Sequence, residues 1–275
     1  MQFLTRSVAL ATGVTLAYIE KGDPTGLPIV FLHGITDSHR SYEPVLEILP
    51  DRYRAFALTA RGHGDSSRPE TGYAPEDMAA DVAAFLDVQG IDKAVIAGHS
   101  MSSMVARAFA HRYPKRVLGL VLMGAFASLH ANPLVDELWQ GVDALGEDIP
   151  EAFARDFQLS TLAKPVPPAY LDMVVAETQK VPGFVFKAAL KGLMDRDRTF
   201  VGAGSLVPTL VAWGDREAIV PRSDQDVLLT AFKNAKLVVF AGGGHAFHWE
   251  SPATFVSELV AWLRKVEHLR NKAAA

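Results

Sequence analysis

The sequence contains no cysteine and no long apolar run. Without cysteine there can be no disulfide, no thiolate zinc site and no cysteine nucleophile. No stretch approaches the roughly 20 apolar residues that a membrane-spanning helix needs. Residues 1–12 also lack the charged segment and sustained apolar core of a signal peptide. We therefore expect a cytoplasmic protein that does not associate with membranes.

The sequence also lacks a cluster of positive charge. Its 27 Lys and Arg residues are scattered among 31 Asp and Glu residues, and the formal net charge is −4. A nucleic-acid-binding chain gathers its basic residues on one face, so nucleic acid is not an expected partner. The nine histidines show no metal-ligand spacing. Nothing in the sequence requires a metal or an organic cofactor.

What the sequence does contain is a regular alternation of strand-like and helix-like segments. Short continuous apolar runs are typical of strands buried on both faces. Residues 7–20 have the pattern of a β-hairpin. The order strand, helix, strand indicates an α/β fold with a mostly parallel sheet and helices on both faces. The predicted strands after the hairpin are Ile29–Leu32, Tyr53–Leu58, Ala94–Ala97, Val117–Met123, Thr209–Trp213 and Leu237–Phe240.

The alternation stops at Phe126 and resumes near Ser205. Between them we find helical patches and no convincing strand, with prolines at or near the helix starts. The sequence therefore predicts a core of residues 1–125 and 206–275 and a helical insertion of residues 126–205. The predicted helices of the insertion are Pro133–Leu145, Pro150–Leu159, Pro168–Gln179 and Gly183–Met194.

The most informative stretch is Val95–Ser102, in which an apolar run and Gly98 lead to Ser100. The following residues have helical spacing, so Ser100 is predicted to sit in a tight turn between a strand and a helix. Such a turn exposes a hydroxyl to substrate and to a base. The residues two before and two after the serine approach each other there, so both must be small. Ser102 is small, but it adds a Cβ at a crowded position.

Two further candidates follow predicted strands of the same sheet. Asp215 follows the strand that ends at Trp213, and His245 follows three glycines after the strand that ends at Phe240. Ligands bind beyond the carboxyl ends of parallel strands. We therefore predict that Ser100 attacks a carbonyl carbon, His245 transfers its proton, and Asp215 orients the imidazole.

A developing oxyanion needs two backbone N–H donors. Met101, directly after the candidate nucleophile, should provide one, and Ile35, in the loop after Leu32, should provide the other. Phe126 and Trp139 are candidate substrate contacts at the start of the insertion.

The order of these motifs resembles the α/β-hydrolase superfamily, in its capped, esterase- or lactonase-like group. The resemblance covers the full length. It rests on His33-Gly34, on Gly98-His99-Ser100-Met101, on Gly214-Asp215 and on Gly244-His245, together with the loop Arg61-Gly62-His63-Gly64-Asp65-Ser66. It implies an eight-stranded, mostly parallel sheet and a helical cap in the position of residues 126–205.

The expected activity is a serine hydrolase that cleaves carboxylic esters or lactones of small to medium apolar molecules. Relatives with an aspartate nucleophile are set aside, because the turn carries Ser100. Carbon–carbon bond hydrolases and perhydrolases share the same motifs and remain open, as does a slow-turnover signal receptor or regulatory protein. The natural substrate and the oligomeric state do not follow from the sequence.

Overall fold

The structure of the protein, a computed structural model, describes residues 3–127, 129, 132–195 and 206–274. Their central feature is an eight-stranded sheet with the order β1-β2-β4-β3-β5-β6-β7-β8. The strands are β1 (Arg6–Ala9), β2 (Thr15–Gly22), β3 (Leu27–Leu32), β4 (Tyr53–Leu58), β5 (Ala94–His99), β6 (Val117–Met123), β7 (Thr209–Gly214) and β8 (Ala235–Phe240).

The sheet is mostly parallel, as predicted. β1 and β2 form an antiparallel hairpin, and β2 pairs antiparallel with β4. Every other pairing is parallel, from β4 with β3 through to β7 with β8. The carboxyl ends of β3 to β8 therefore share one edge of the sheet, where residues that follow these strands can meet.

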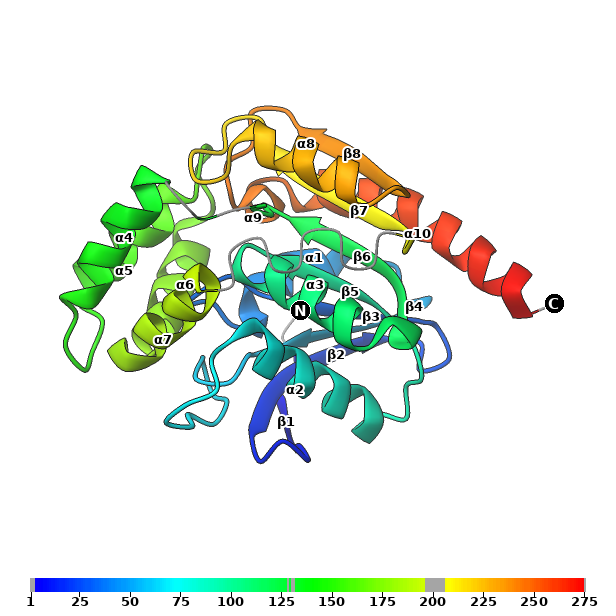
Figure 1. The fold of residues 1–275 in the computed structure, drawn as a ribbon, viewed down its shortest axis with the longest axis horizontal. Coiled ribbons are helices and arrows are strands. Elements are labelled where there is room, and N and C mark those ends of the chain that lie inside the picture. Colours follow the sequence, from blue (N-terminus) through cyan, green and yellow to red (C-terminus); the bar gives the residue numbers. More distant parts are fainter. Residues whose placement is uncertain (1–2, 128, 130–131, 196–205, 275) are drawn as a thin grey trace.

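Helices cover both faces of the sheet (Figure 1), which explains the continuous apolar runs of its strands. Ile96 belongs to one apolar core and its neighbour Val95 to the other, since successive strand residues point to opposite faces. The helices on the first face are α2 (Pro75–Val88), α3 (Met101–Arg112) and α8 (Arg222–Ala231). Those on the second are α1 (Glu43–Ile48), the short α9 (Phe247–Glu250) and α10 (Pro252–Ala274).

Helices α4 to α7 lie between β6 and β7 in the chain and form a group at one end of the molecule (Figure 1). They are α4 (Pro133–Asp143), α5 (Glu151–Ser160), α6 (Pro168–Gln179) and α7 (Gly183–Met194). These bounds agree with the predicted helices to within about one turn. Residues 196–205, which the sequence assigns to the end of the insertion, lie outside the described residues. No helix among the described residues is both long and apolar enough to cross a membrane.

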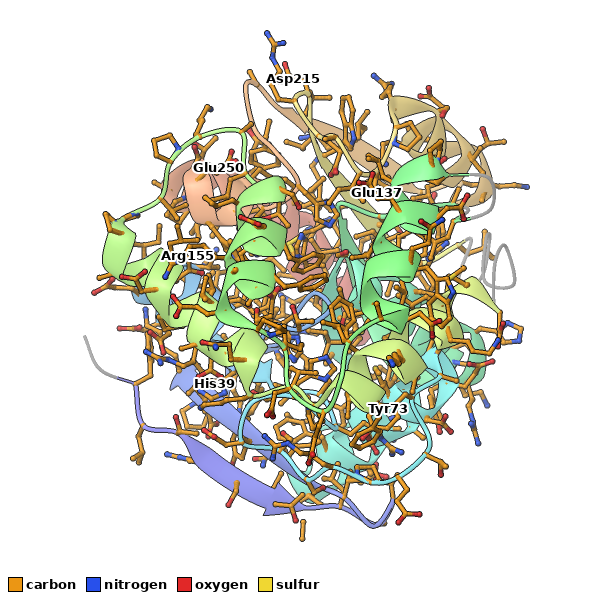
Figure 2. The ribbon with its side chains drawn as sticks, turned by 90° about the vertical axis from the view of Figure 1, so that its left-hand side faces the viewer. His39, Tyr73, Glu137, Arg155, Asp215 and Glu250 are labelled. Carbon is orange, nitrogen blue, oxygen red and sulfur yellow. The ribbon has the colours of Figure 1, made fainter. Side chains whose placement is uncertain are left out.

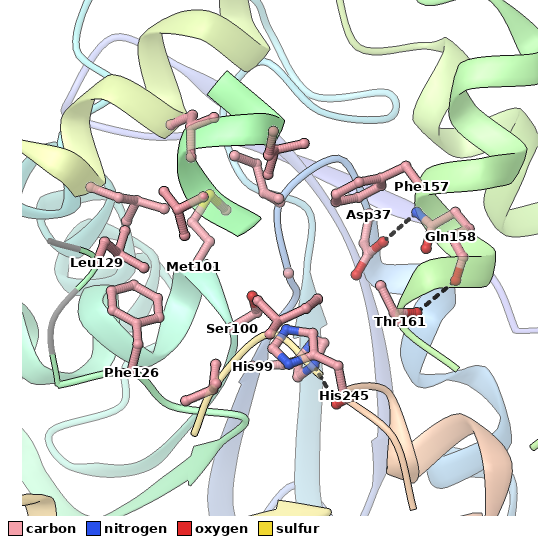
Figure 3. A pocket seen from close by; sticks show the side chains of 18 of the residues that line it. Asp37, His99, Ser100, Met101, Phe126, Leu129, Phe157, Gln158, Thr161 and His245 are labelled. Atoms are coloured by element: carbon pink, nitrogen blue, oxygen red, sulfur yellow. Dashed lines mark hydrogen bonds between the residues drawn. The ribbon is translucent and has the colours of Figure 1, made fainter. Parts of the chain in front are cut away.

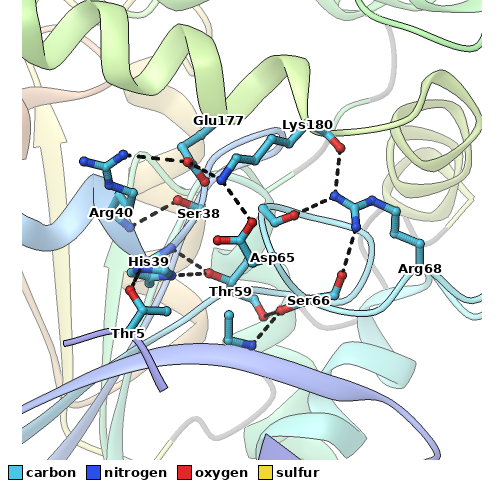
Figure 4. Close-up of polar contacts among 12 residues, drawn as sticks. Thr5, Ser38, His39, Arg40, Thr59, Asp65, Ser66, Arg68, Glu177 and Lys180 are labelled. Carbon is cyan, nitrogen blue, oxygen red and sulfur yellow. Dashed lines mark hydrogen bonds and ion pairs between the residues drawn. The ribbon is translucent and has the colours of Figure 1, made fainter. Parts of the chain in front are cut away.

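Polar contacts fasten the end of α6 to the core of the protein (Figure 4). Lys180 Nζ lies 3.0 Å from an Asp65 oxygen and 2.9 Å from a Glu177 oxygen. Arg68, from the same loop as Asp65, donates hydrogen bonds to the carbonyl oxygens of Gly64 and Lys180 at 2.6 and 3.1 Å. Exposed ion pairs contribute little individually, but together with the backbone contacts they fix the position of α6.

Candidate active site

Ser100 sits at the turn between β5 and α3 with φ 51° and ψ −116°. A non-glycine residue rarely adopts this backbone conformation, which costs of the order of 1–3 kcal/mol. The Ser100 N–H donates to the Met123 carbonyl at 2.9 Å, so the turn is tied to β6. The Ser100 hydroxyl is bonded to no other described residue, and Ser100 is partly exposed toward a pocket. The structure thus has the exposed serine turn that the sequence predicts.

The close approach across this turn explains Gly98. A Cβ at residue 98 would lie 2.0 Å from the carbonyl oxygen of Ser102, so only glycine fits. Ser102 is accommodated because its side chain points toward the loop after β3, where its hydroxyl donates to the His33 carbonyl at 2.5 Å. The serine side chain at residue 102 therefore adds a hydrogen bond between α3 and the loop after β3.

His245 is paired with Glu217. His245 Nδ1 lies 2.8 and 2.7 Å from the two carboxyl oxygens of Glu217, whose side chain is fully buried. One of these oxygens also accepts the N–H groups of Ile219 and Val220 at 3.0 and 3.1 Å. A carboxylate at Nδ1 holds the ring proton on that atom, which leaves Nε2 with the lone pair that a general base needs.

Asp215 is not at this position, which corrects the predicted partner of His245. It is exposed at the rim of the molecule (Figure 2), where its carboxylate accepts the Gly242 N–H at 2.6 Å. The reason is a turn in which the Glu217 N–H donates to the Gly214 carbonyl at 3.2 Å. This turn places Asp215 at its outer side and returns Glu217 to the sheet edge. The only sequence signal for Glu217 was a second carboxylate in the same loop.

A glycine at the end of β6 makes room for the His245 ring. A Cβ at Gly124 would lie 2.9 Å from both Cε1 and Nδ1 of His245 and 3.5 Å from a Glu217 oxygen. On the other side, His99 Nε2 lies 3.1 Å from the His245 carbonyl oxygen. Burial lowers the pKa of His99 well below its ordinary value, so His99 stays neutral and donates to that carbonyl. His99 at the end of β5 thus holds the histidine loop, and Gly124 after β6 leaves space for the ring.

The two predicted oxyanion donors lie beside Ser100. Ile35 and Met101 both line the pocket, and neither backbone N–H donates to another described residue. Thr36, next to Ile35, has φ 68°, and the Asp37 N–H donates to the Gly34 carbonyl at 3.2 Å, so the chain turns sharply here. Two unpaired donors next to a serine hydroxyl are what an oxyanion site requires.

Ser100 and His245 face the same pocket (Figure 3), which has about 620 Å³ of empty space including its open side. Phe126 lines it, as predicted, but Trp139 does not and packs against the apolar core instead. The insertion supplies part of the apolar wall. The wall residues from α4, α5 and α7 are Val135, Leu138, Phe157, Leu190 and Leu193.

A groove between α4 and α5 adjoins the pocket and shares four lining residues with it, namely Val135, Leu138, Phe157 and Ile219. We call this groove the mouth. Its other lining residues are Leu134, Glu137, Gly141, Phe153, Asp156, Ser160 and Ala218. Figure 2 views the molecule from this side, with Glu137 on α4.

Sequence reasoning missed two polar residues of the pocket, Asp37 and Gln158. Asp37 follows β3 and is 3% exposed, and Gln158 of α5 is 1% exposed. Gln158 Nε2 donates to one Asp37 oxygen at 3.0 Å. Burial raises the pKa of Asp37 to about 7, while the Gln158 hydrogen bond and His245 act in the opposite direction. These residues are 121 positions apart in the sequence, so no local sequence pattern predicts their contact.

Comparison with known proteins identifies the fold family of the chain. Residues 28–252 match the family model described as alpha/beta hydrolase fold. The chain is 28% identical over 283 residues to a non-heme haloperoxidase of Rhodococcus erythropolis, covering 96% of this chain and 99% of the relative. It is 36% identical to the 2-(acetamidomethylene)succinate hydrolase of Mesorhizobium japonicum over 150 residues, which cover 54% and 52% of the two chains. The structure is similar to an esterase from Exiguobacterium antarcticum with TM-score 0.85 and 20% identity, covering 95% of this chain and 100% of the esterase.

Proposed function

Because the chain belongs to the α/β-hydrolase fold family, we propose that it is a serine hydrolase that cleaves carboxylic ester or lactone bonds through an acyl-enzyme. The observation that carries this proposal is the strained turn at Ser100, which faces one pocket together with His245 and its buried partner Glu217. The apolar lining of the pocket supports a small to medium substrate with an apolar body. A small-molecule substrate is consistent with the names of similar proteins, which include a 2-(acetamidomethylene)succinate hydrolase and an esterase.

In the proposed reaction, Ser100 Oγ bonds to the carbonyl carbon while its proton passes to His245 Nε2. The carbonyl oxygen becomes an oxyanion that the Ile35 and Met101 N–H groups stabilise. The bond to the leaving oxygen then breaks, and that oxygen takes the proton from His245. A water molecule repeats the sequence on the acyl-enzyme, which releases the acid and restores Ser100. Glu217 stabilises the imidazolium in both halves.

The helical insertion is proposed to act as a cap over this site, with residues 1–125 and 206–275 as the core and residues 126–205 as the cap. Two features support this. Residues of α4, α5 and α7 line the same pocket as Ser100, and the mouth lies between α4 and α5. Contacts of Lys180 and Arg68 fix α6 to the core, so substrate entry is proposed to take place on the α4–α5 side.

The test is hydrolysis of short p-nitrophenyl esters by the wild type and by Ser100→Ala. We expect turnover to fall by about 10⁴-fold or more in the variant, because the nucleophile is lost. Circular dichroism and the melting temperature provide the control for folding. Wild-type turnover in Ser100→Ala would contradict the proposal.

A second measurement separates an enzyme from a slow-turnover receptor. An organophosphonate should label one serine per chain, and multiple-turnover ester hydrolysis should follow in the unlabelled protein. Stoichiometric labelling with almost no turnover would favour the receptor. Hydrolysis of a ring-cleavage diketone instead of esters would favour the carbon–carbon hydrolase, and formation of a peracid and water from a carboxylic acid and added hydrogen peroxide would favour the perhydrolase.

A further inference from the structure

Asp37 presents an unused acceptor to the pocket. One of its oxygens accepts the hydrogen bond from Gln158 Nε2, the backbone N–H of Gly34 also acts on the carboxyl group, and the second oxygen accepts no side-chain hydrogen bond among the described residues. Figure 3 shows this second oxygen directed into the pocket, on the side of Ser100 and His245. A carboxylate in an apolar wall is costly when no cation among the described pocket residues compensates its charge, unless a ligand or water does so.

The Gln158 amide adds a second acceptor. Its nitrogen donates to Asp37 and, at 2.8 Å, to the Thr178 hydroxyl. That hydroxyl donates onward to the Val174 carbonyl at 3.0 Å, so it must accept from Gln158. The two contacts fix the orientation of the amide and leave its oxygen without a donor among the described residues. Asp37 and Gln158 thus offer acceptors and no free N–H.

The charged side chains that line the mouth are negative, as is the ionised carboxyl group of Asp37 in the pocket. Glu137 of α4 and Asp156 of α5 are exposed there, and among the described residues no lysine or arginine lines either the mouth or the pocket. Arg155, next to Asp156, is engaged with Glu151 and Asp172 at 3.1 and 2.9 Å. Carboxyl groups therefore stand at the entrance and at the inner wall of the pocket, which favours entry of a cation over an anion.

We propose that the pocket selects esters that carry a protonated amine, with the pocket-facing oxygen of Asp37 accepting a hydrogen bond from the ammonium group. This inference rests on the proposed ester hydrolysis and specifies its substrate class. The apolar walls hold the carbon skeleton of the substrate, and Asp37 holds its charged end. An ammonium group supplies both the donor and the compensating charge that this carboxyl lacks.

The experiment compares butanoate esters of matched size at about pH 7.5, where the tertiary amine is protonated and Asp37 is largely ionised. Dimethylaminoethyl butanoate carries charge and an N–H donor. Butyrylcholine carries charge alone, and neohexyl butanoate is the uncharged carbon isostere of butyrylcholine. An ω-carboxyalkyl butanoate adds the opposite charge. Released butanoate is measured by chromatography, and each ester yields a kcat/KM.

For the wild type we expect kcat/KM to fall in the order dimethylaminoethyl, choline, neohexyl and carboxyalkyl ester. Asp37→Asn should reduce the ratio of the dimethylaminoethyl to the neohexyl ester by about tenfold or more, as expected for loss of a charge-assisted hydrogen bond. Asp87→Asn is the matched control, because Asp87 is an exposed residue of α2 that pairs with Arg116 and does not line the pocket. It should leave the ratio unchanged.

The outcomes separate this inference from the proposed function. If the wild type hydrolyses no ester of the set and no p-nitrophenyl ester, the proposed function fails. If the neohexyl or carboxyalkyl ester is hydrolysed as well as the cationic esters, the selection for amines is overturned while ester hydrolysis stands. A ratio that does not change in Asp37→Asn overturns the assignment to Asp37.

Discussion

Glu217 and Asp37 are both buried carboxyl groups at the edge of one sheet, but their surroundings differ. Glu217 has contacts on both oxygens, from His245 and from two backbone N–H groups. Asp37 has one oxygen held by Gln158, a backbone contact from Gly34, and a second oxygen that faces the pocket without a side-chain partner among the described residues. A carboxylate whose two oxygens both contact the protein can orient a neighbour, whereas one with an oxygen facing the pocket can bind what enters it.

The difference arises from the loops that carry the two residues. The loop after β7 turns back at residues 214–217 and presents the Ile219 and Val220 N–H groups to Glu217. The loop after β3 turns at Thr36, and the side-chain hydrogen bond to Asp37 comes from Gln158 of α5. Both oxygens of Glu217 are thus held by its own loop and by His245, whereas the side-chain contact to Asp37 holds one oxygen and comes from the helical insertion.

The largest expected effect comes from Glu217→Gln. The variant keeps the shape of the side chain, but it removes the charge that stabilises the imidazolium and no longer imposes the tautomer with the proton on Nδ1. We expect kcat for ester hydrolysis to fall by about 10³–10⁴-fold with little change in KM, as for the aspartate of a serine protease triad. Steady-state kinetics on p-nitrophenyl butanoate measure this.

Asp215→Asn is the matched control, two residues away in the same loop. Because Asp215 contacts Gly242 at the rim and not His245, its kcat should stay within about threefold of the wild type, since exposed substitutions away from the reacting groups have small effects. A large loss in Asp215→Asn with normal activity in Glu217→Gln would reverse the assignment made from the structure.

Gly124→Ala tests the pair of His245 and Glu217 by displacing the His245 ring. The new Cβ would stand 2.9 Å from the ring, so the ring must move away from Glu217 or from Ser100. We expect kcat to fall by about 10²-fold, the effect of a misplacement of about 1 Å. Gly90→Ala controls for backbone strain, because Gly90 has φ 63° and no heavy atom within 4 Å of the added Cβ. It should lower the melting temperature without lowering kcat.

The smallest effect concerns stability and pH. Burial raises the pKa of Asp37 to about 7 from its ordinary value of 3.8. The folded state therefore binds more protons than the unfolded state between these values, and the free energy of unfolding falls as pH rises through that window. Asp37→Asn has no carboxyl group to ionise, so its free energy of unfolding lacks this fall with pH. The asparagine side-chain oxygen can still accept the hydrogen bond from Gln158. The free energy of unfolding of the variant relative to the wild type should rise by about 2–3 kcal/mol from about pH 5 to about pH 8.

The other titratable groups near Asp37 are His99, His245, Tyr42 and Tyr170. Burial lowers the pKa of His99 well below its ordinary value and raises the pKa values of both tyrosines well above theirs, so these three stay neutral across the window. Urea unfolding of the wild type, Asp37→Asn and the control Asp87→Asn at each pH gives the free energies. A difference between the wild type and Asp37→Asn that does not change with pH would contradict the prediction.

The sequence is informative about the fold where the cause of structure is local. The bounds of β4, β6, α6 and α7 follow from apolar runs and from prolines at or near helix starts, and they match the predicted ranges. The four-residue α9 was not predicted because it is too short to show a period. The order of the strands depends on contacts between distant segments, on which the periodicity has no bearing.

For the candidate site too, the sequence is informative only where the cause of the structure is local. Ser100 and His245 can be found from motifs, because a tight turn and a glycine run have local signatures. The choice between Asp215 and Glu217 depends on the direction of one turn, and both residues satisfy the spacing. Trp139 was the wrong residue of α4, since its neighbour Leu138 lines the pocket and successive helix residues point about 100° apart.

The backbone of Ser100 has one further consequence. Glycine adopts a φ of 51° without steric strain, whereas serine is strained in this conformation. Replacing Ser100 by glycine should therefore make the chain harder to unfold while it ends catalysis. Stability alone would favour glycine at this position, so the strained serine is consistent with a functional role of its hydroxyl group, here proposed to be that of the nucleophile.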